Sequence, residues 1–301
     1  MLPKTARAAL LIALSGFALL SIGDAVVKSM AGAWPGTAVA ALRYSFGLAG
    51  LAIVVAAMHG RAGFVLPRPW LQFGRGAAVA LATICFFMGV MAMPLADATA
   101  IQFTSPIVTA VLAPLVLKER SPPAVWLATL LAFAGVLVVL RPNLYELGLV
   151  ALYPLGAAVG MSWLMMLNRK VAGMAPLMVM QLIVAAFAAP LLVAAAVLLD
   201  LGGGAAFQVG PPSLEVVVKC LFVAFSATAG HALIFAGVIR ANAAAVAPMT
   251  YVQLIAATAI GWAWFGEVPD AATWAGAALI IAGGLWLLRA QTEPPVAETP
   301  D

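Results

Sequence analysis

One stretch of this chain occurs twice, and the repetition limits the folds that are open to it. Residues 96–141 read ADATAIQFTSPIVTAVLAPLVLKERSPPAVWLATLLAFAGVLVVLR, and residues 245–289 read AVAPMTYVQLIAATAIGWAWFGEVPDAATWAGAALIIAGGLWLLR. At an offset of 148 residues, Glu119 aligns with Glu267 and Trp126 with Trp274. Each copy has an apolar run of about 20 residues, an acidic turn and a second apolar run, a pattern typical of two membrane-spanning helices. In a chain of 301 residues, this period predicts two similar halves.

Ten apolar runs fill almost the whole chain. Hydrophobic residues make up 65% of it, charged residues only 9%, and the mean hydropathy is +1.10, so a water-soluble fold could not cover the apolar surface. We expect an all-α integral membrane protein with ten transmembrane helices, over residues 8–27, 37–58, 75–93, 96–117, 124–140, 147–167, 176–199, 216–239, 243–265 and 273–288. The chain then divides into a five-helix repeat at 1–142, a second at 143–290, and a disordered cytoplasmic tail at 291–301.

The basic residues predict the orientation. The net charge of +4 and the pI of 9.3 do not indicate nucleic-acid binding, because no basic run or aromatic-basic groove accompanies them. With a cytoplasmic N-terminus, eleven Lys and Arg residues fall at cytoplasmic helix ends and three at outer ends, namely Lys28, Arg141 and Lys219. The positive-inside rule therefore predicts that both termini are cytoplasmic. Because five helices per half is an odd number, the two repeats would be inverted, as in many secondary transporters.

Polar residues inside the predicted spans are the candidates for function. A guanidinium in the bilayer costs at least about 2.5–3.5 kcal/mol unless it is paired or hydrated, so Arg43 should face the interior of the bundle. It could bind an anionic substrate or belong to a structural ion pair with Asp24 or Asp97. Asp24 and Lys28 are four residues apart on one helix, a spacing that favours an ion pair between them. Asp24 is alternatively a candidate for exchanging a proton during transport.

The repeated helices carry matching amides. The fourth run has Gln102 and Ser105 on one polar face, and the ninth has Gln253 beside Tyr251. An amide in lipid seeks a partner, either another helix or a substrate. Pro106 and Pro248 should each remove a hydrogen bond within these helices.

Three more residues complete the candidate site. His231 is the only histidine within a predicted span and is a candidate for packing, ligand stacking or proton coupling. Tyr44 and Trp163 could stack on an aromatic substrate, although core packing is the plainer interpretation. Cys85 and Cys220 are far apart and lack a CxxC partner, so we predict no disulfide, no metal site and no cofactor. No nucleophile with its base is present, and we predict that the chain is not an enzyme.

The run ADATAIQFTSPIVTAVLAPLVLKER with the following AFAGVLVVLRP helix, together with its second copy, resembles an EamA-type repeat of the drug/metabolite transporter superfamily. The resemblance covers residues 8–289. It implies ten helices in two inverted repeats, a central cavity lined by helices one to four and six to nine, and helices five and ten at the periphery. It also implies movement of small metabolites across the bacterial inner membrane by alternating access. The opening, GDAVVKSM with LRYSFGLAG, is similar to the branch of S-adenosylmethionine and riboflavin transporters.

We therefore predict a multi-pass carrier of a small organic metabolite, such as an amino acid, S-adenosylmethionine or riboflavin. Its expected partners are this substrate and membrane lipids, with no nucleic acid, and it would be a monomer or a homodimer. The alternatives are a lipid flippase, which would need a lateral opening, and a membrane-embedded enzyme. The predicted substrate-binding residues are Arg43, Tyr44, Gln102, Ser105, Trp163, His231, Tyr251 and Gln253, with Asp24 and His231 as candidates for proton coupling.

Overall fold

The chain is built from helices throughout its described residues, which are 4–117, 123–241 and 251–292 of the computed structural model. A helix satisfies its backbone N–H and C=O groups internally, as the water-free interior of a bilayer requires. The α-helices are α1 (Lys4–Lys28), α2 (Gly36–His59), α3 (Pro69–Ala92), α4 (Leu95–Gln102), α5 (Ser105–Leu117), α6 (Pro123–Leu147), α7 (Tyr153–Val171), α8 (Leu177–Leu201), α9 (Leu214–Ala241), α11 (Tyr251–Phe265) and α12 (Ala271–Thr292). Short 3-10 turns are η1 (Gly60–Phe64), η2 (Gly148–Leu152) and η3 (Ala205–Phe207). The all-α prediction is confirmed.

Six of the described helices are long and apolar enough to cross a membrane. They are α1, α2 with η1, α3, η2 with α7, α8 and α9. Two shorter apolar helices follow, Tyr251–Phe265 and Ala271–Trp286. The chain is therefore a multi-pass membrane protein.

The fourth apolar run, predicted as one helix over residues 96–117, is two helices in the structure. α4 ends at Gln102 and α5 begins at Ser105. Pro106 has no N–H to give to the carbonyl of Gln102. The turn is closed instead by hydrogen bonds between residues three apart in sequence. The N–H of Thr104 donates to the carbonyl of Ile101 at 3.1 Å. The predicted effect of Pro106 is confirmed, whereas Pro248 lies outside the described residues.

The last helix of each half ends later than predicted. α6 runs through Arg141 and Pro142, which we expected to form a connection, and ends at Leu147. The turn comes instead at Gly148, whose φ of +62° is readily adopted only by glycine. α12 likewise continues to Thr292, so the predicted tail at 291–301 begins within this helix. The remainder of the tail lies outside the described residues.

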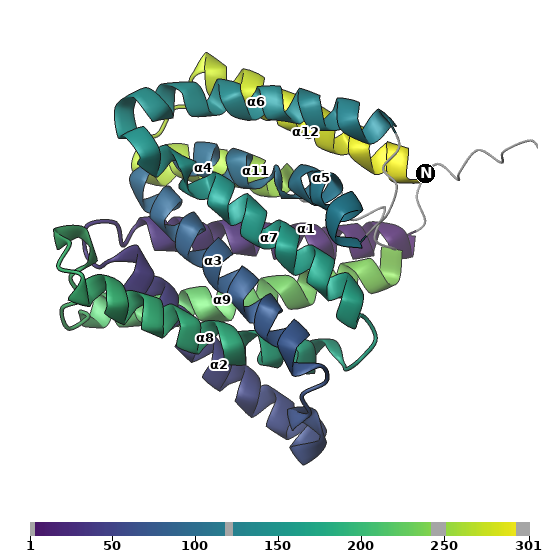
Figure 1. Cartoon of the computed structure of the whole chain (residues 1–301), viewed down its shortest axis with the longest axis vertical. Helices are drawn as coiled ribbons and strands as arrows, with labels where there is room; N and C mark the ends of the chain where they lie inside the picture. Colours follow the sequence, from purple (N-terminus) through teal and green to yellow (C-terminus); the bar gives the residue numbers. More distant parts are fainter. Residues whose placement is uncertain (1–3, 118–122, 242–250, 293–301) are drawn as a thin grey trace, which may run out of the picture.

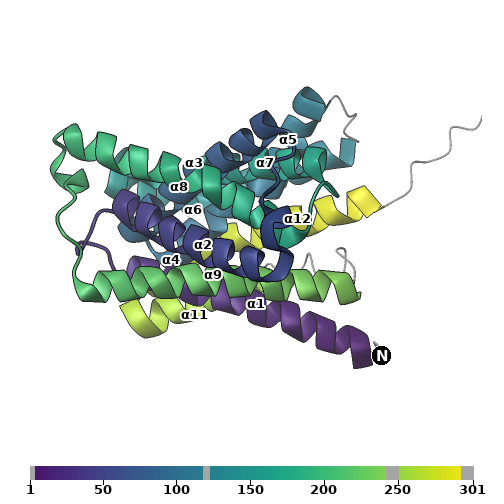
Figure 2. The same ribbon diagram turned by 90° about the horizontal axis from the view of Figure 1, so that it is seen from below.

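Each helix in the first half packs most extensively on a helix of the second half. The pairs are α1 with α9, α2 with α8, α3 with α7, α4 with α11, α5 with α7, and α6 with α12. Figure 1 shows α6 and α12 side by side along one edge of the bundle, and Figure 2 shows α1 beside α9. The two halves therefore interlock and share one core.

Glycines let the paired helices approach closely. A Cβ atom built on Gly16 of α1 would lie only 2.7 Å from the carbonyl oxygen of Gly230 on α9. One built on Gly135 of α6 would lie 2.7 Å from the carbonyl oxygen of Gly276 on α12. Small residues at such crossings are a common basis for helix association in membranes, because they bring two backbones into van der Waals contact.

The turn after α1 has a counterpart after α7. Residues 28–36 read KSMAGAWPG and residues 169–177 read RKVAGMAPL. Gly32 has a φ of +76° and Gly173 a φ of +78°. In both turns a proline immediately precedes the next helix, with φ and ψ of −59° and 136° at Pro35 and −56° and 151° at Pro176. The turn between α1 and α2 and the turn between α7 and α8 thus have similar backbone conformations.

Candidate functional site

A partly buried ion pair joins the halves at one end of the bundle. Lys28, the last residue of α1, places its Nζ 2.7 Å from Oε1 of Glu267 in the connection between α11 and α12. The two side chains are only 11% and 21% exposed. The predicted Asp24–Lys28 pair is therefore wrong, because Lys28 is turned toward a partner that lies far along the chain.

Backbone groups complete the surroundings of this ion pair, which we call the Lys28 cluster. The ammonium of Lys28 also donates to the carbonyl oxygens of Val90 at 3.2 Å and Met93 at 2.6 Å. The second carboxylate oxygen of Glu267 accepts the N–H of Leu95, the first residue of α4, at 3.0 Å. Each charge thus has several hydrogen bonds, as a buried pair needs if it is to offset the loss of hydration.

Asp24 bonds across the halves to a different residue. The Gln253 amide of α11 donates from Nε2 to Oδ2 of Asp24 at 3.1 Å. The hydroxyl of Ser21, one turn earlier on α1, donates to the backbone carbonyl of Gln253 at 3.1 Å. The structure therefore brings together Asp24 and Gln253, two of the residues that the sequence singled out, and holds α11 against α1 at this point.

Arg43 lies half-buried on α2 against aromatic rings. Its guanidinium carbon is 4.5 Å from the centre of the Tyr44 ring and 5.7 Å from that of Phe87 on α3. Asp24 and His231 lie close enough to interact electrostatically with this guanidinium. Among the described residues no carboxylate forms an ion pair with Arg43, and the Asp97 carboxylate instead accepts a hydrogen bond from Thr273 at 2.8 Å. Arg43 thus keeps donors available for a ligand.

His231 and Tyr44 have defined hydrogen-bond partners. Nδ1 of His231 lies 2.7 Å from the carbonyl oxygen of Ala227, so Nδ1 carries the hydrogen and Nε2 is left as an acceptor in the neutral ring. The hydroxyl of Thr83 donates to the Tyr44 hydroxyl oxygen at 3.3 Å. We call Asp24, Arg43, His231 and Gln253 the central polar group.

Tyr251 packs beside the break between α4 and α5. Its ring meets Phe103 edge to face, with the centres 6.0 Å apart. Gln102 ends α4 next to this contact, and its side-chain amide has no hydrogen-bond partner within the described ranges. Among the described residues, the Gln102 amide is thus unpaired, while the amide of Gln253 is bonded to Asp24.

Ser105 lies at a different contact, between α5 and α7. The hydroxyl of Ser162 lies 2.7 Å from the backbone carbonyl oxygen of Ser105, and the adjacent Trp163 is 40% exposed. Among the described residues, no hydrogen bond, ion pair or ring contact connects Ser105 or Trp163 with the central polar group. The hydroxyls of Thr99 and Thr109 on the predicted polar face bond carbonyls one turn back, at 2.7 and 2.8 Å, as Thr often does in membrane helices.

Sequence reasoning missed the Lys28 cluster and the role of Phe87. The duplicated acidic turn did mark Glu267, but neither periodicity nor spacing could supply its partner 239 residues earlier. Within the part of the chain that the structure describes, no three His, Cys, Asp or Glu side chains gather as a metal site would require. The arrangement offers one cationic and one anionic side chain with amide and aromatic neighbours, and this suits a polar organic molecule.

The apolar helices and the polar residues between them are those of a multi-pass membrane protein with a polar interior. Residues 7–141, somewhat less than half of the chain, match the model of the EamA-like transporter family. The matched segment coincides with the first of the two expected repeats.

Three bacterial relatives are similar to the chain over most of its length. The riboflavin transporter of Rhizobium johnstonii is 29% identical over 73% of this chain and 70% of its own. An S-adenosylmethionine uptake transporter of Rickettsia prowazekii is 26% identical over 77% of this chain and 76% of its own. The pseudopaline exporter CntI of Pseudomonas aeruginosa is 26% identical over 94% of this chain and 96% of its own. A crystal structure with 20% identity has the same fold, with a TM-score of 0.60 over 95% of this chain and 99% of that one.

Proposed function

We propose that the chain is a secondary carrier of a small organic metabolite that works by alternating access. In this proposal ten transmembrane helices form two inverted five-helix repeats, residues 1–142 and 143–290, in the bacterial inner membrane. Both termini are cytoplasmic, in accordance with the positive-inside rule. The proposal goes beyond the similarity to the EamA-like transporter family over residues 7–141 in naming the mechanism, the site and the orientation.

The exchange of packing partners between the halves is the observation that carries this proposal. If the repeats are related by a two-fold axis, a contact of the first helix of one half with the third of the other must occur twice. The structure has both, as α1 with α9 and α3 with α7. The second helices pair with each other, and so do the fifth helices, as α2 with α8 and α6 with α12. Rocking of such halves around a shared midplane site is a common route to alternating access.

The central polar group is the proposed substrate site. Arg43 supplies a permanent positive charge that cannot be deprotonated, and Gln102, Gln253 and Tyr251 supply polar and aromatic contacts from α4 and α11. Tyr44 and His231 are further residues proposed to contact substrate there, and Ser105 on α5 and Trp163 on α7 are proposed contacts outside the central polar group. The relatives are named for riboflavin, S-adenosylmethionine and pseudopaline, which favours a small organic metabolite as the substrate of this chain too.

Asp24 is the proposed proton-coupling residue, with His231 as the second candidate. Asp24 is held by Gln253 at 3.1 Å and lies in the field of Arg43, so its protonation would change both contacts. The Lys28 cluster is the proposed closure at the outer end, because the ion pair ties α1 to the connection between α11 and α12. It must break if the halves part on that side.

Transport by the purified protein in liposomes tests the proposal. We expect exchange of an internal unlabelled metabolite for the external labelled one, measured in turn with riboflavin, S-adenosylmethionine and a set of amino acids. The activity should require no ATP and should be lost in Arg43→Ala. Exchange that Arg43→Ala leaves intact would reject the site, and hydrolysis or modification of the metabolite would reject the carrier function.

A further inference from the structure

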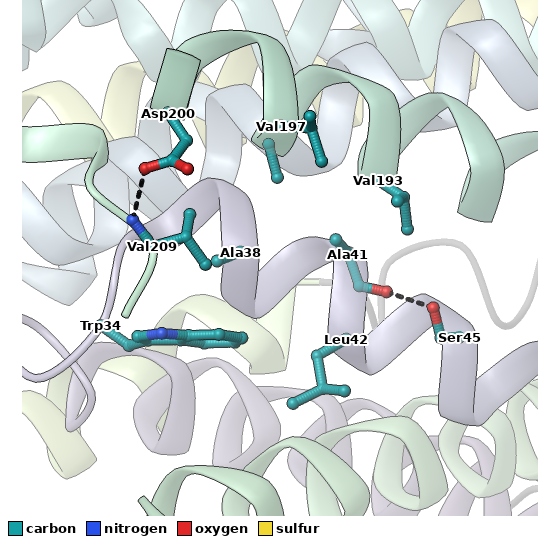
Figure 3. A pocket seen from close by; sticks show the side chains of 10 residues that line it. Trp34, Ala38, Ala41, Leu42, Ser45, Val193, Val197, Asp200 and Val209 are labelled. Atoms are coloured by element: carbon teal, nitrogen blue, oxygen red, sulfur yellow. Dashed lines mark hydrogen bonds between the residues drawn. The ribbon is translucent and has the colours of Figure 1, made fainter. Parts of the chain in front are cut away.

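A pocket of about 310 Å³ lies between α2 and α8, separate from the central polar group. Figure 3 shows the side chains that line it. The lining residues of α2 recur at intervals of three or four positions and so share one face of that helix, and the same holds for those of α8. Trp34 and Val209 close one end of the pocket. The lining residues are Trp34, Ala38, Ala41, Leu42, Ser45, Val193, Ala196, Val197, Asp200 and Val209.

The long walls of this α2–α8 pocket are apolar and open sideways. Val193 and Val197 on α8 are 43% and 50% exposed. Val193 lies in the interior of α8 and Val197 one turn before its end, and apolar side chains exposed on the outer surface of a spanning helix meet hydrocarbon. The hydroxyl of Ser45 donates to the carbonyl of Ala41 at 2.8 Å, so it offers little polarity to the pocket. An acyl chain therefore matches the walls.

One end of the pocket carries a carboxylate without a cationic partner. Asp200, next to last in α8, accepts the N–H of Val209 on Oδ1 at 2.8 Å. None of the described residues forms an ion pair with Asp200, so its charge is not compensated by the protein around it. Trp34 stands at the same end of the pocket (Figure 3). Its Nε1 donates to the carbonyl of Gly210 at 2.9 Å, which fixes the ring, and the ring lines the pocket.

This end of the pocket favours a cation. A carboxylate near a low-dielectric wall attracts an ammonium more strongly than it would in bulk water, and an indole face attracts the same group. Asp200 lies at the end of α8 and Trp34 in the connection just before α2, and aromatic residues at such positions mark the depth of lipid headgroups. A phospholipid with an ammonium headgroup would satisfy both parts of the pocket, the headgroup at this depth and an acyl chain along the walls.

We propose that the α2–α8 pocket binds a membrane phospholipid with an ammonium headgroup, such as an ethanolamine phospholipid. One acyl chain occupies the space between Ala38 and Val197, and the ammonium lies at Asp200. This inference goes beyond the carrier function and does not depend on which metabolite is carried.

Lipid binding to the purified full-length protein tests the inference. Dioleoyl phosphatidylethanolamine and dioleoyl phosphatidylglycerol have the same chains, so titration of each, followed by native mass spectrometry, isolates the headgroup. We expect phosphatidylethanolamine to bind about five-fold more tightly, which is the scale of one partly exposed charge pair. Asp200→Asn keeps the acceptor for Val209 and should abolish this preference. Val197→Phe should fill the pocket and weaken the binding of both lipids.

Two matched controls separate pocket effects from general ones. Asp270→Asn changes another carboxylate that accepts a backbone N–H, from Thr273 at 2.7 Å. Val218→Phe makes the same enlargement on α9 at a side chain that is 56% exposed. Neither should alter lipid preference or affinity. Equal binding of the two lipids by the wild type, a preference that survives Asp200→Asn, or equal weakening by Val218→Phe and Val197→Phe would overturn the inference.

Discussion

Lys28 Nζ and Glu267 Oε1 are 2.7 Å apart, and this ion pair joins the end of α1 to a connection in the other half of the chain. Lys28 also reaches the carbonyls that end α3, and Glu267 the N–H that begins α4. A single charged contact thus fixes the ends of four segments. It is also the feature that sequence spacing assigned to the wrong partner.

Removing one member of the ion pair should destabilise the folded protein. Glu267→Gln leaves the Lys28 ammonium without its counter-ion at a partly buried site, which we expect to cost about 1–3 kcal/mol. We expect Tm to fall by about 5 °C or more, measured in detergent by the fluorescence of the tryptophans. Glu215→Gln is the control, because the pair of Glu215 with Lys219 lies one helical turn apart at an exposed site. An unchanged Tm in Glu267→Gln would show that the pair contributes nothing to stability.

Exchanging the two charges should not restore stability. In Lys28→Glu with Glu267→Lys, a carboxylate would face the carbonyl oxygens of Val90 and Met93, which now accept from Lys28 at 3.2 and 2.6 Å. Carboxylate and carbonyl oxygens are both acceptors, so they repel each other. The measurement is the Tm of the double variant beside each single one. A double variant as stable as the wild type would mean that charge attraction alone matters here.

Arg43→Ala should abolish transport without lowering the amount of protein in the membrane. Arg43→Lys keeps the charge but loses the planar fork, so a comparable loss would indicate bidentate recognition of the substrate. Initial uptake rates and membrane abundance are measured together. The control is Arg61→Ala in η1, outside the central polar group, which should transport normally. If Arg43→Ala is unstable as well as inactive, Arg43 is primarily a structural residue.

Asp24→Asn should separate coupling from binding. The asparagine still offers an oxygen to Nε2 of Gln253 but can no longer take up a proton. We therefore expect substrate exchange in liposomes to persist, while accumulation driven by an imposed pH gradient is lost. Both activities are measured on the same preparation. Equal loss of both would place Asp24 in substrate binding or folding, and normal accumulation would transfer the coupling role to His231.

The helix contacts between halves should be sensitive to a single methyl group. A Cβ atom at Gly160 would lie 2.8 Å from the backbone oxygen of Ala78, so Gly160→Ala should force α7 from α3 and cost about 1–3 kcal/mol. Gly47→Ala on α2 is the matched control, since nothing lies within 4 Å of its added methyl. The control should be neutral or stabilise the protein by up to about 1 kcal/mol. The readout is Tm, and equal effects of the two changes would contradict the packing argument.

Much of the helical architecture could be predicted because apolar length determines it locally. Residues 37–58 were predicted as a span and α2 covers Gly36–His59, since proline and glycine bound the apolar run on both sides. Helix boundaries were predicted wrongly where the same residue type can either end a helix or lie within one. Pro142 lies inside α6, although a proline more often ends a helix. The break after Gln102 was indicated by Pro106 but not placed.

The candidate site was predictable residue by residue but not pair by pair. The free-energy cost of placing a polar side chain in hydrocarbon singles out Asp24, Arg43 and Gln253 individually. The structure does bring Asp24 and Gln253 together. Contacts between residues more than 200 positions apart depend on how ten apolar runs pack, and similar runs carry little information about their neighbours. Ser105, equally polar by sequence, accordingly lies at another contact, between α5 and α7.

The packing of each first-half helix on a second-half helix has a consequence for the separated pieces. If the chain were cut at the turn after α6, each piece would lose the partner of nearly every helix and keep only its weaker internal contacts. Reassembly would then follow mass action, as it does for an obligate dimer, with stability set by the concentration of both pieces. The covalent link in the intact chain acts as a high effective concentration, and it permits an interface whose contacts can be broken and remade without the halves being lost to one another.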